Sequence, residues 1–156
     1  FEDFSSDGDL TLVTQIGDDV AELSGMVARI EQAGLLDKVG CDPQGLGGIV
    51  DALHAAEIPE DKIIGISQGW KMTGAIKTAE RKLAEGAMIH GGQPMMAWCV
   101  GNAKVVPSGN ATLITKQASG SGKIDPLMAL LNAVTLMSLN PESRKSVYEE
   151  RGLTLI

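Results

Sequence analysis

Short apolar segments alternate along this chain with longer stretches in which apolar residues recur every three or four positions. Val39–Cys41 and Lys62–Ile66 have the length and apolar character of buried strands. Each is followed by a stretch with helical periodicity, Leu46–Leu53 after the first and Trp70–Glu85 after the second. Strands that alternate with helices in this way favour parallel pairing with helices on the sheet faces. The pattern therefore predicts an α/β domain with a partly parallel sheet.

The remaining segments extend this pattern, and the 156 residues are enough for one domain. Periodicity, turn residues and helix-terminating residues predict further elements on both sides of the central units. They are an extended segment at Leu10–Thr14, helices at Asp18–Gly34 and Pro94–Val100 and from Asp125, a strand at Met88–Ile89, a hairpin of Lys104–Val106 and Thr112–Thr115, a polar loop at Gln117–Gly122 and a short helix from Asn140. We expect residues 1–156 to form a single domain.

Local signals at helix ends make finer predictions. Asp19 and Glu22 are spaced as in a capping box at the start of the first long helix. Asp125 precedes a proline, which is typical of an N-cap residue with proline at the first helical position. Apolar spacing places Leu83 on the same side of its helix as Ile76 and Ala79, and Met137 continues the apolar residues of the last long helix.

The charge of the chain is divided between its two halves. Residues 1–70 hold 14 acidic and 3 basic side chains, a net charge of −11, whereas residues 71–156 hold 6 acidic and 10 basic side chains, a net charge of +4. Such separation can mark an oriented interaction surface, and the alternative is an ordinary acidic surface. The second half is suited to binding phosphates, whereas the first half repels nucleic acid unless metal ions bridge the two.

Several classes of function lack their signature here. Cys41 and Cys99 have no Cys-x-x-Cys spacing, which favours two buried thiols over a disulfide framework or a zinc site. Ser119–Lys123 looks like a phosphate loop but lacks its first glycine and the hydroxyl residue after the lysine. His54 and His90 have no spacing that names a catalytic partner. No apolar run approaches the ~20 residues of a membrane-spanning helix.

Two aspartates at chain reversals are the candidate catalytic and metal-ligating residues. Asp42 follows a predicted strand and Asp125 opens a predicted helix, and a proline follows each. In one interpretation, Asp42 only stabilises a turn and Asp125 only caps a helix. In the other, both carboxylates face one cleft and bind divalent cations, because hard cations such as Mg²⁺ prefer oxygen ligands. Residue chemistry alone leaves both interpretations open.

Basic side chains in the second half are the candidate nucleic-acid contacts. Lys77 and Arg81 lie four residues apart on one predicted helix face, while Lys104, Lys116 and Lys123 flank the hairpin in a stretch without acids until Asp125. In the functional interpretation they contact phosphates, which positions DNA without reading its sequence. In the alternative they are solvated surface lysines and an arginine.

Motifs in a consistent order carry a resemblance to a known family. They are Gly8-Asp9-Leu10-Thr11, Val39-Gly40-Cys41-Asp42-Pro43, His90-Gly91-Gly92-Gln93-Pro94, Trp98, Asn102, Val105, Lys116 and Lys123-Ile124-Asp125 with Ala129. In this order and spacing the chain resembles the C-terminal nuclease part of the large subunit of tailed-phage terminases. The resemblance covers nearly the whole chain.

The resemblance implies a ribonuclease-H-like fold, a mixed sheet flanked by helices, and a metal-dependent endonuclease that cuts concatemeric double-stranded DNA during packaging. In that family three acidic residues hold two Mg²⁺ or Mn²⁺ ions, and by position Asp42 matches the second acid and Asp125 the third. The implied partners are double-stranded DNA and, through the full-length protein, the terminase small subunit and the portal. The implied location is the host bacterial cytoplasm, with no membrane contact and no nucleotide bound by this part.

One departure from the family pattern concerns the first acid. The family's first strand, which carries that acid, is expected upstream of residue 1, so the domain is expected to be N-terminally incomplete and weakly active or inactive alone. Two other functions remain open. One is a catalytically inactive docking module of the packaging machinery with the same fold. The other is an unrelated α/β enzyme for a small molecule, which would need an apolar pocket with convergent polar groups.

Overall fold

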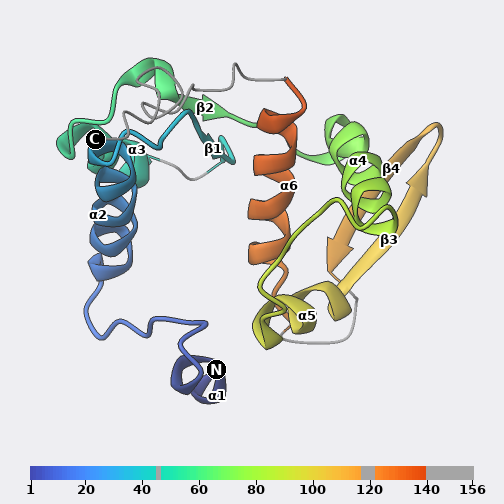
Figure 1. The fold of residues 1–156 in the computed structure, drawn as a ribbon, viewed down its shortest axis with the longest axis horizontal. Helices are drawn as coiled ribbons and strands as arrows, with labels where there is room; N and C mark the ends of the chain where they lie inside the picture. The colour runs from blue at the N-terminus through green and yellow to red at the C-terminus, as the bar shows by residue number, and fades with distance from the viewer. Residues whose placement is uncertain (45–46, 117–121, 140–156) are drawn as a thin grey trace, which may run out of the picture.

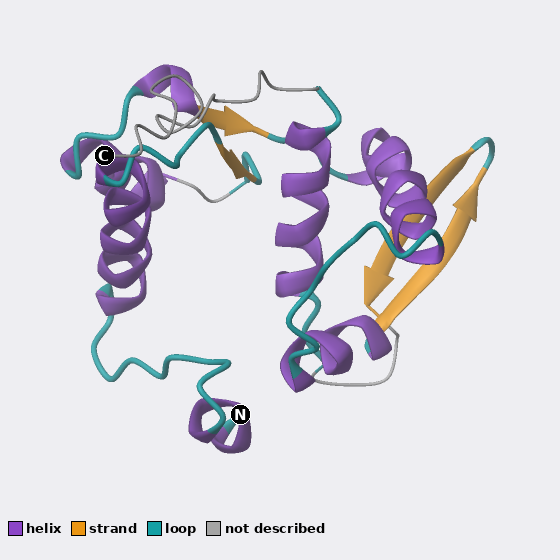
Figure 2. Ribbon diagram, in the orientation of Figure 1, coloured by secondary structure: helices purple, strands orange, loops and turns teal. Residues whose placement is uncertain are grey.

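The computed structural model describes residues 1–44, 47–116 and 122–139. These residues form helices around two small sheets (Figures 1 and 2). The coarse sequence prediction, a mixed α/β chain with a parallel strand pair, is confirmed. The ribonuclease-H-like fold remains a prediction, because the described strands form two separate two-stranded sheets. The prediction for a helix from Asn140 and most of the predicted loop Gln117–Gly122 fall outside the described residues.

The first half contains the parallel sheet. Its elements are α1 (Glu2–Ser6), α2 (Asp18–Gln32), β1 (Val39–Cys41), α3 (Gly47–Ala55), the 3-10 turn η1 (Glu60–Lys62) and β2 (Ile63–Gly65). The strands pair in parallel with Gly40 opposite Ile64. A core of Val27, Leu36, Leu53 and Ile58 lies between α2, α3 and the segments that lead into the sheet.

The second half contains an antiparallel hairpin and the larger of the two hydrophobic cores among the described residues. Its elements are the 3-10 turn η2 (Gly69–Met72), α4 (Thr73–Ala84), α5 (Pro94–Gly101), β3 (Ala103–Ser108), β4 (Ala111–Lys116) and α6 (Asp125–Met137). The predicted hairpin is confirmed, with Val105 opposite Ile114. Met72, Ala75, Ile76 and Ala79 of the η2–α4 segment pack against Leu131 and Val134 of α6.

Helix α6 joins the two halves, as Figure 1 shows. A Cβ built on Gly40 would lie 3.0 Å from the Leu136 side chain and 3.1 Å from that of Ile66, so glycine permits the close approach of β1 to α6. Next to this contact, the Gln68 side-chain amide donates to the buried Asn132 Oδ1 at 3.0 Å and to the carbonyl of Ile66 at 2.8 Å. A satisfied polar pair therefore fixes the register of α6 against the sheet.

The chain start packs against α5. The rings of Phe1 and Phe4 lie 5.8 Å and 5.6 Å from the Trp98 ring, centroid to centroid. Asp9 Oδ2 accepts the backbone N–H of Met95 at 3.2 Å, in the first turn of α5. A carboxylate at that position satisfies a backbone donor that the helix leaves unpaired. The predicted extended segment at Leu10–Thr14 is not in a strand.

Several finer predictions are wrong. The N-cap of helix α2 is Gly17, which has a φ of 97°. The start of the helix has no side-chain capping bond, so the capping box predicted at Asp19 is absent. Asp125 is the first residue of α6 rather than its N-cap, which is Ile124. Met88–Ile89 forms no strand.

The apolar sides of α4 and α6 end in exposed side chains, since Leu83 and Met137 are 51% and 64% exposed. Both lie in the last turn of a helix, where the described chain places no element over them. Helical periodicity indicates which face of a helix is apolar, but it does not indicate how far along the helix the packing continues.

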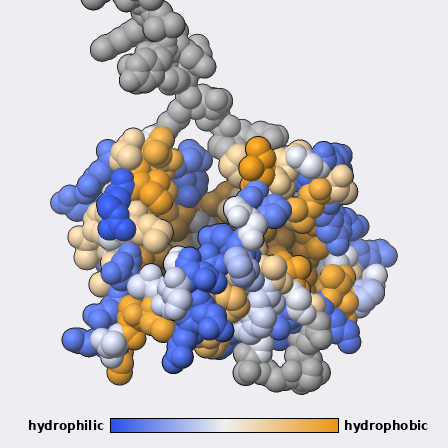
Figure 3. Space-filling view, turned by 60° about the horizontal axis from the view of Figure 1, so that its bottom comes forward, coloured by the Kyte–Doolittle hydropathy of each residue, from blue (hydrophilic) through white to orange (hydrophobic). Residues whose placement is uncertain are grey.

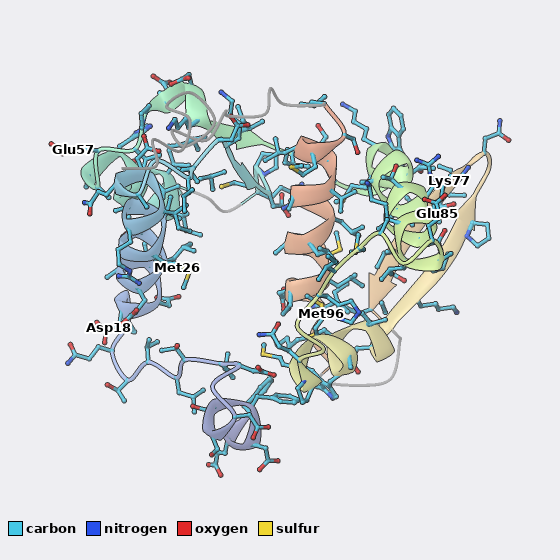
Figure 4. All side chains as sticks on the ribbon, in the orientation of Figure 1. Asp18, Met26, Glu57, Lys77, Glu85 and Met96 are labelled. Carbon is cyan, nitrogen blue, oxygen red and sulfur yellow. The ribbon has the colours of Figure 1, made fainter. Side chains whose placement is uncertain are left out.

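The inner side of α2 is apolar and partly uncovered. Leu23, Met26 and Ile30 recur at helical spacing and remain exposed, while Val27 of the same helix is buried against α3. Figure 4 shows Met26 directed toward the middle of the molecule, and Figure 3 shows hydrophobic residues gathered around a recess in one face. Among the described residues, no helix is long and apolar enough to span a membrane.

Candidate functional site

Asp42 lies at the carboxyl end of the parallel sheet, directly after β1. The N–H of Ile66 donates to the carbonyl of Cys41 at 2.7 Å, so the sheet contact continues up to this residue. Asp42 Oδ1 accepts the backbone N–H of Gln44 at 3.0 Å, which stabilises the turn that Pro43 begins. The carboxylate is exposed to solvent. Asp42 therefore stabilises a turn, as predicted, and metal binding by the same carboxylate remains a prediction.

Asp125 lies at the N-terminal end of α6, where the helix dipole favours a negative charge. It is exposed, but the residue before it, Ile124, is 6% exposed and belongs to the protein interior. Because Ile124 is anchored, the first turn of α6 is fixed although its carboxylate faces solvent. This is the arrangement expected of a ligand that must keep its position without being buried.

Asn102 holds the segment that leads into Asp125. Its side-chain amide donates to the carbonyl of Lys123 at 3.1 Å. A Cβ built on Gly122 would lie 2.8 Å from the Asn102 Cγ, so only glycine allows the two segments to approach this closely. Asn102 is itself the C-cap of α5, and its backbone N–H bonds to the carbonyls of Trp98 and Cys99. The end of α5 therefore positions the start of α6.

The Cys99 thiol lies close enough to Asp125 for the negative charge of that carboxylate to affect its pKa. Cys99 is fully buried, and burial raises its pKa above the ordinary value because the thiolate is poorly solvated. The negative charge of Asp125 raises the same pKa further. Burial likewise raises the pKa of Cys41. Both cysteines are free and buried thiols, as the sequence predicts.

The two aspartates lie at different places relative to α6. Asp125 opens the helix, whereas the strand that ends before Asp42 contacts Asn132 and Leu136, two or more turns further along. Figure 1 shows β1 beside the C-terminal half of α6 and α5 beside its N-terminal end. Over residues 1–44, 47–116 and 122–139, no three His, Cys, Asp or Glu side chains gather closely enough to hold a metal ion. Convergence of the two carboxylates on one metal pair therefore remains a prediction.

The candidate DNA-binding residues divide between surfaces. Lys77 and Arg81 are exposed on α4, and Figure 4 shows Lys77 on the side of the molecule that carries the hairpin. Arg81 Nε lies 3.8 Å from Glu85 Oε1, an exposed ion pair that contributes little stability. The structure brings Lys77 and Arg81 together on one helix, as predicted.

The hairpin lysines are not brought together. Lys104 is opposite Thr115, and Lys116 is opposite Ala103. Since successive side chains of a strand point to opposite faces, Lys104 and Lys116 lie on opposite faces of the hairpin. Lys123 is exposed two residues before Asp125. A single phosphate-binding surface therefore does not follow from these five residues alone.

Sequence reasoning missed two hydrogen bonds, from the Asn102 amide to the carbonyl of Lys123 and from the Met95 N–H to Asp9, and it also missed the exposure of the Trp70 ring. The two bonds join residues that are far apart in the chain, and no local pattern announces them. His54 and His90 are exposed, and His90 Nδ1 accepts the N–H of Gly92 at 3.1 Å in its own turn.

Comparison with known proteins gives two matches and one negative result. The model of the family described as terminase large subunit, endonuclease domain, matches residues 6–140. Protein YmfN of Escherichia coli (strain K12) is 28% identical over 95 residues, which are 60% of this chain and 20% of YmfN. The aligned part thus spans about a fifth of that relative. No solved structure matches the chain.

Proposed function

Because this chain belongs to the family of terminase large-subunit endonuclease domains, we propose that it cuts double-stranded viral DNA during packaging by metal-dependent phosphodiester hydrolysis. The observation that carries the proposal is the family match over residues 6–140, which includes both Asp42 and Asp125. The surroundings of Asp125 support it, since buried and hydrogen-bonded neighbours hold an exposed carboxylate in place.

Asp42 and Asp125 are the proposed catalytic and metal-binding residues. Their oxygens suit Mg²⁺ or Mn²⁺, cations that commonly bind through one or two carboxylates together with substrate phosphates. A pair of such ions would activate a water molecule and stabilise the departing oxygen of the DNA strand. The family resemblance implies a third acidic ligand, which neither Asp42 nor Asp125 matches. The partners proposed with this role are the terminase small subunit and the portal, in the host bacterial cytoplasm.

The residues of this chain have their own tasks in that reaction. Asn102 and the close contact at Gly122 orient the first turn of α6 and keep the Asp125 carboxylate at one position. The turn bond from Gln44 does the same for Asp42 by occupying one of its oxygens. Lys123, two residues before Asp125, is placed to contact a phosphate close to the scissile one. The proposed contacts to phosphates further away are made by Lys77, Arg81, Lys104 and Lys116.

Calorimetric titration with Mn²⁺ tests the proposal directly. We expect binding by the parent chain and its loss in both Asp42→Asn and Asp125→Asn, because each variant removes a charged ligand while keeping the shape. Asp51→Asn is the matched control, since Asp51 is an exposed acid on α3. Undiminished Mn²⁺ binding in either site variant would reject that residue as a ligand.

One observation favours a second function, a catalytically inactive docking module. The partly uncovered apolar face of α2, Leu23, Met26 and Ile30, lies in the acidic half of the chain and is suited to a protein contact. In that case Asp42→Asn would leave assembly of the packaging complex unchanged, and no DNA cleavage would appear when the full-length protein is supplied with Mn²⁺. Cleavage under those conditions would exclude the docking module as the sole function.

A further inference from the structure

Trp70 is an exposed tryptophan beside the tip of the β3–β4 hairpin. Its side chain is 65% exposed, whereas Trp98, the other tryptophan, packs against two phenylalanines. An open groove of about 550 Å³ lies between η2 and the hairpin tip, lined by Trp70, Lys71, Thr73, Ser108, Asn110 and Ala111. Large aromatic side chains left in solvent are typical of binding surfaces. The groove is separate from both candidate metal ligands.

The two walls of this groove are fixed to each other. The Thr73 hydroxyl accepts the backbone N–H of Thr112 at 3.0 Å and donates to the carbonyl of Trp70 at 2.7 Å. One side chain therefore connects the turn that carries Trp70 to strand β4. Because its walls do not need to be ordered on binding, the groove loses little conformational entropy when it is occupied.

The surroundings of the groove are positively charged. Residues 69–116, which include both walls of the groove, contain six Lys or Arg and two Asp or Glu, a net charge of +4; of these, Lys116 lies at the base of the hairpin, on the face opposite Lys104. Lys71 Nζ lies 5.7 Å from the centre of the Trp70 ring. Lys77 and Arg81 follow on the next turns of α4. By strand alternation, Lys104 shares a face of the hairpin with Ser108, which lines the groove.

The lining is chemically suited to a nucleic-acid backbone. Hydroxyl, amide and ammonium groups of Ser, Asn and Lys are common donors to phosphate and sugar oxygens. The indole offers an N–H donor and an apolar face, which matches the mixture of phosphate and deoxyribose along a DNA strand. An acidic protein segment would complement the positive charge of the groove, but it would leave the Ser108 and Asn110 side chains at the hairpin tip without an evident role.

We propose that Trp70, Lys71 and the hairpin tip bind the sugar–phosphate backbone of duplex DNA at a distance from the cleavage site. This inference rests on the proposed function. Asn102, which precedes β3, bonds to the segment before Asp125, so the base of the hairpin lies at the Asp125 end. Five steps along β3, at ~3.4 Å each, separate that base from the tip by ~17 Å. That is about five base pairs of DNA, or half a helical turn.

Tryptophan fluorescence provides the test, because the chain has two tryptophans in different settings. In the Trp98→Phe variant, Trp70 is the only tryptophan, and we expect saturable quenching when a duplex DNA is added. In the Trp70→Phe variant, Trp98 reports alone, and we expect no change. The titrations contain a chelator, so they do not depend on a metal site. Quenching of Trp98 alone, or of neither residue, would overturn the proposal.

Affinity measurements with labelled duplex give a second, independent readout. We expect Trp70→Ala to weaken binding about tenfold, and Lys71→Ala to lower the slope of log K against log salt by about one. Arg29→Ala on α2 is the matched control, because Arg29 is an exposed cation in the acidic half. Parent-like affinity and salt slope in both groove variants would overturn the proposal, as would quenching of Trp70 by polyglutamate but not by DNA.

The outcomes separate this inference from the proposed function. DNA binding through Trp70 in a chain whose Mn²⁺ binding is unaffected by Asp42→Asn and Asp125→Asn supports the groove and rejects the metal site. Mn²⁺ binding that depends on both aspartates, with no response at Trp70, rejects the groove and leaves the metal site in place.

Discussion

Gly122 occupies a position where any larger side chain would meet Asn102. We predict that Gly122→Ala lowers the free energy of unfolding by about 1–3 kcal/mol, because the new Cβ would lie 2.8 Å from Asn102 Cγ. Denaturant unfolding followed by circular dichroism measures the change. The Asn102 side chain also bonds to Lys123, so its displacement would loosen the first turn of α6.

Gly74→Ala is a suitable control for that prediction. Gly74 lies within α4, and a Cβ built there has no neighbour within 4 Å. Alanine should therefore stabilise the protein by up to about 1 kcal/mol, through helix propensity alone. Equal effects of the two substitutions would contradict the close contact at Gly122. In Asn102→Ala, the penalty of Gly122→Ala should be smaller, since two of the three close atoms are gone.

Cys99 makes stability depend on pH in the alkaline range. Burial, and then the charge of Asp125, raise the folded pKa of its thiol above the ordinary value of 9.0. Above about pH 9 the unfolded chain therefore holds fewer protons than the folded chain, and the free energy of unfolding falls as pH rises. Below that pH the contribution is fully retained. We expect the fall to be shallower in Cys99→Ala, measured by denaturant unfolding across this range.

The same thiol reports on Asp125 without any metal. In Asp125→Asn the pKa of Cys99 should decrease, because a negative charge near the thiolate is removed, and the NMR shift of the Cys99 Cβ follows the titration. Asp42→Asn should leave this pKa unchanged. If Asp125→Asn leaves the Cys99 pKa unchanged, the Asp125 carboxylate does not lie near the Cys99 thiol.

At the scale of elements, the packing of α6 against α4 forms the core of the second half. We predict that Leu131→Ala lowers the free energy of unfolding by about 2–5 kcal/mol, because Leu131 of α6 is 2% exposed and packs in the cluster with α4. Leu83→Ala, at the exposed end of α4, should change it by less than about 0.5 kcal/mol. Chemical denaturation measures both. A large effect at Leu83 would mean that another element covers the end of α4.

Element types were predictable from local patterns, and several element ends were not. The parallel pair, the hairpin and helices α2 to α6 follow from apolar spacing and turn residues within each segment. The capping box at Asp19 failed because the N-cap is Gly17, two residues earlier, so Asp19 lies inside the first turn of the helix. Met88 packs against the second core from an irregular segment, and its neighbour Ile89 remains exposed, so two apolar residues did not make a strand.

Features of the site could be predicted where they depend on neighbouring residues, and not where they depend on contacts between residues far apart in the sequence. The exposed positions of Asp42 and Asp125 at a strand end and a helix start were predictable, because both depend on neighbouring residues. The bond between Asn102 and Lys123 was not, since it spans 21 residues and depends on how α5 meets α6. The opposite faces of Lys104 and Lys116 depend on the hairpin register, which sequence alone left open.

At the scale of the whole molecule, the two halves differ in charge and in the candidate site residues that they contain. The acidic first half contains the parallel sheet and Asp42, while the basic second half contains the hairpin, Trp70 and Asp125. A DNA duplex on the basic half would be repelled by the other half unless cations lie between them. If the protein binds DNA as proposed, this distribution would orient the duplex, because the basic half attracts it and the acidic half repels it.

The position of α6 as the last described helix has a consequence for biosynthesis. During translation, α4 with Met72, Ile76 and Ala79 is made long before Leu131 and Val134, which cover it. The contact of β1 with Leu136 also waits for this helix. The nascent chain therefore carries an open apolar surface in each half until residues 125–137 leave the ribosome. A ribosome that stalls before that point would present a substrate for chaperones and proteases.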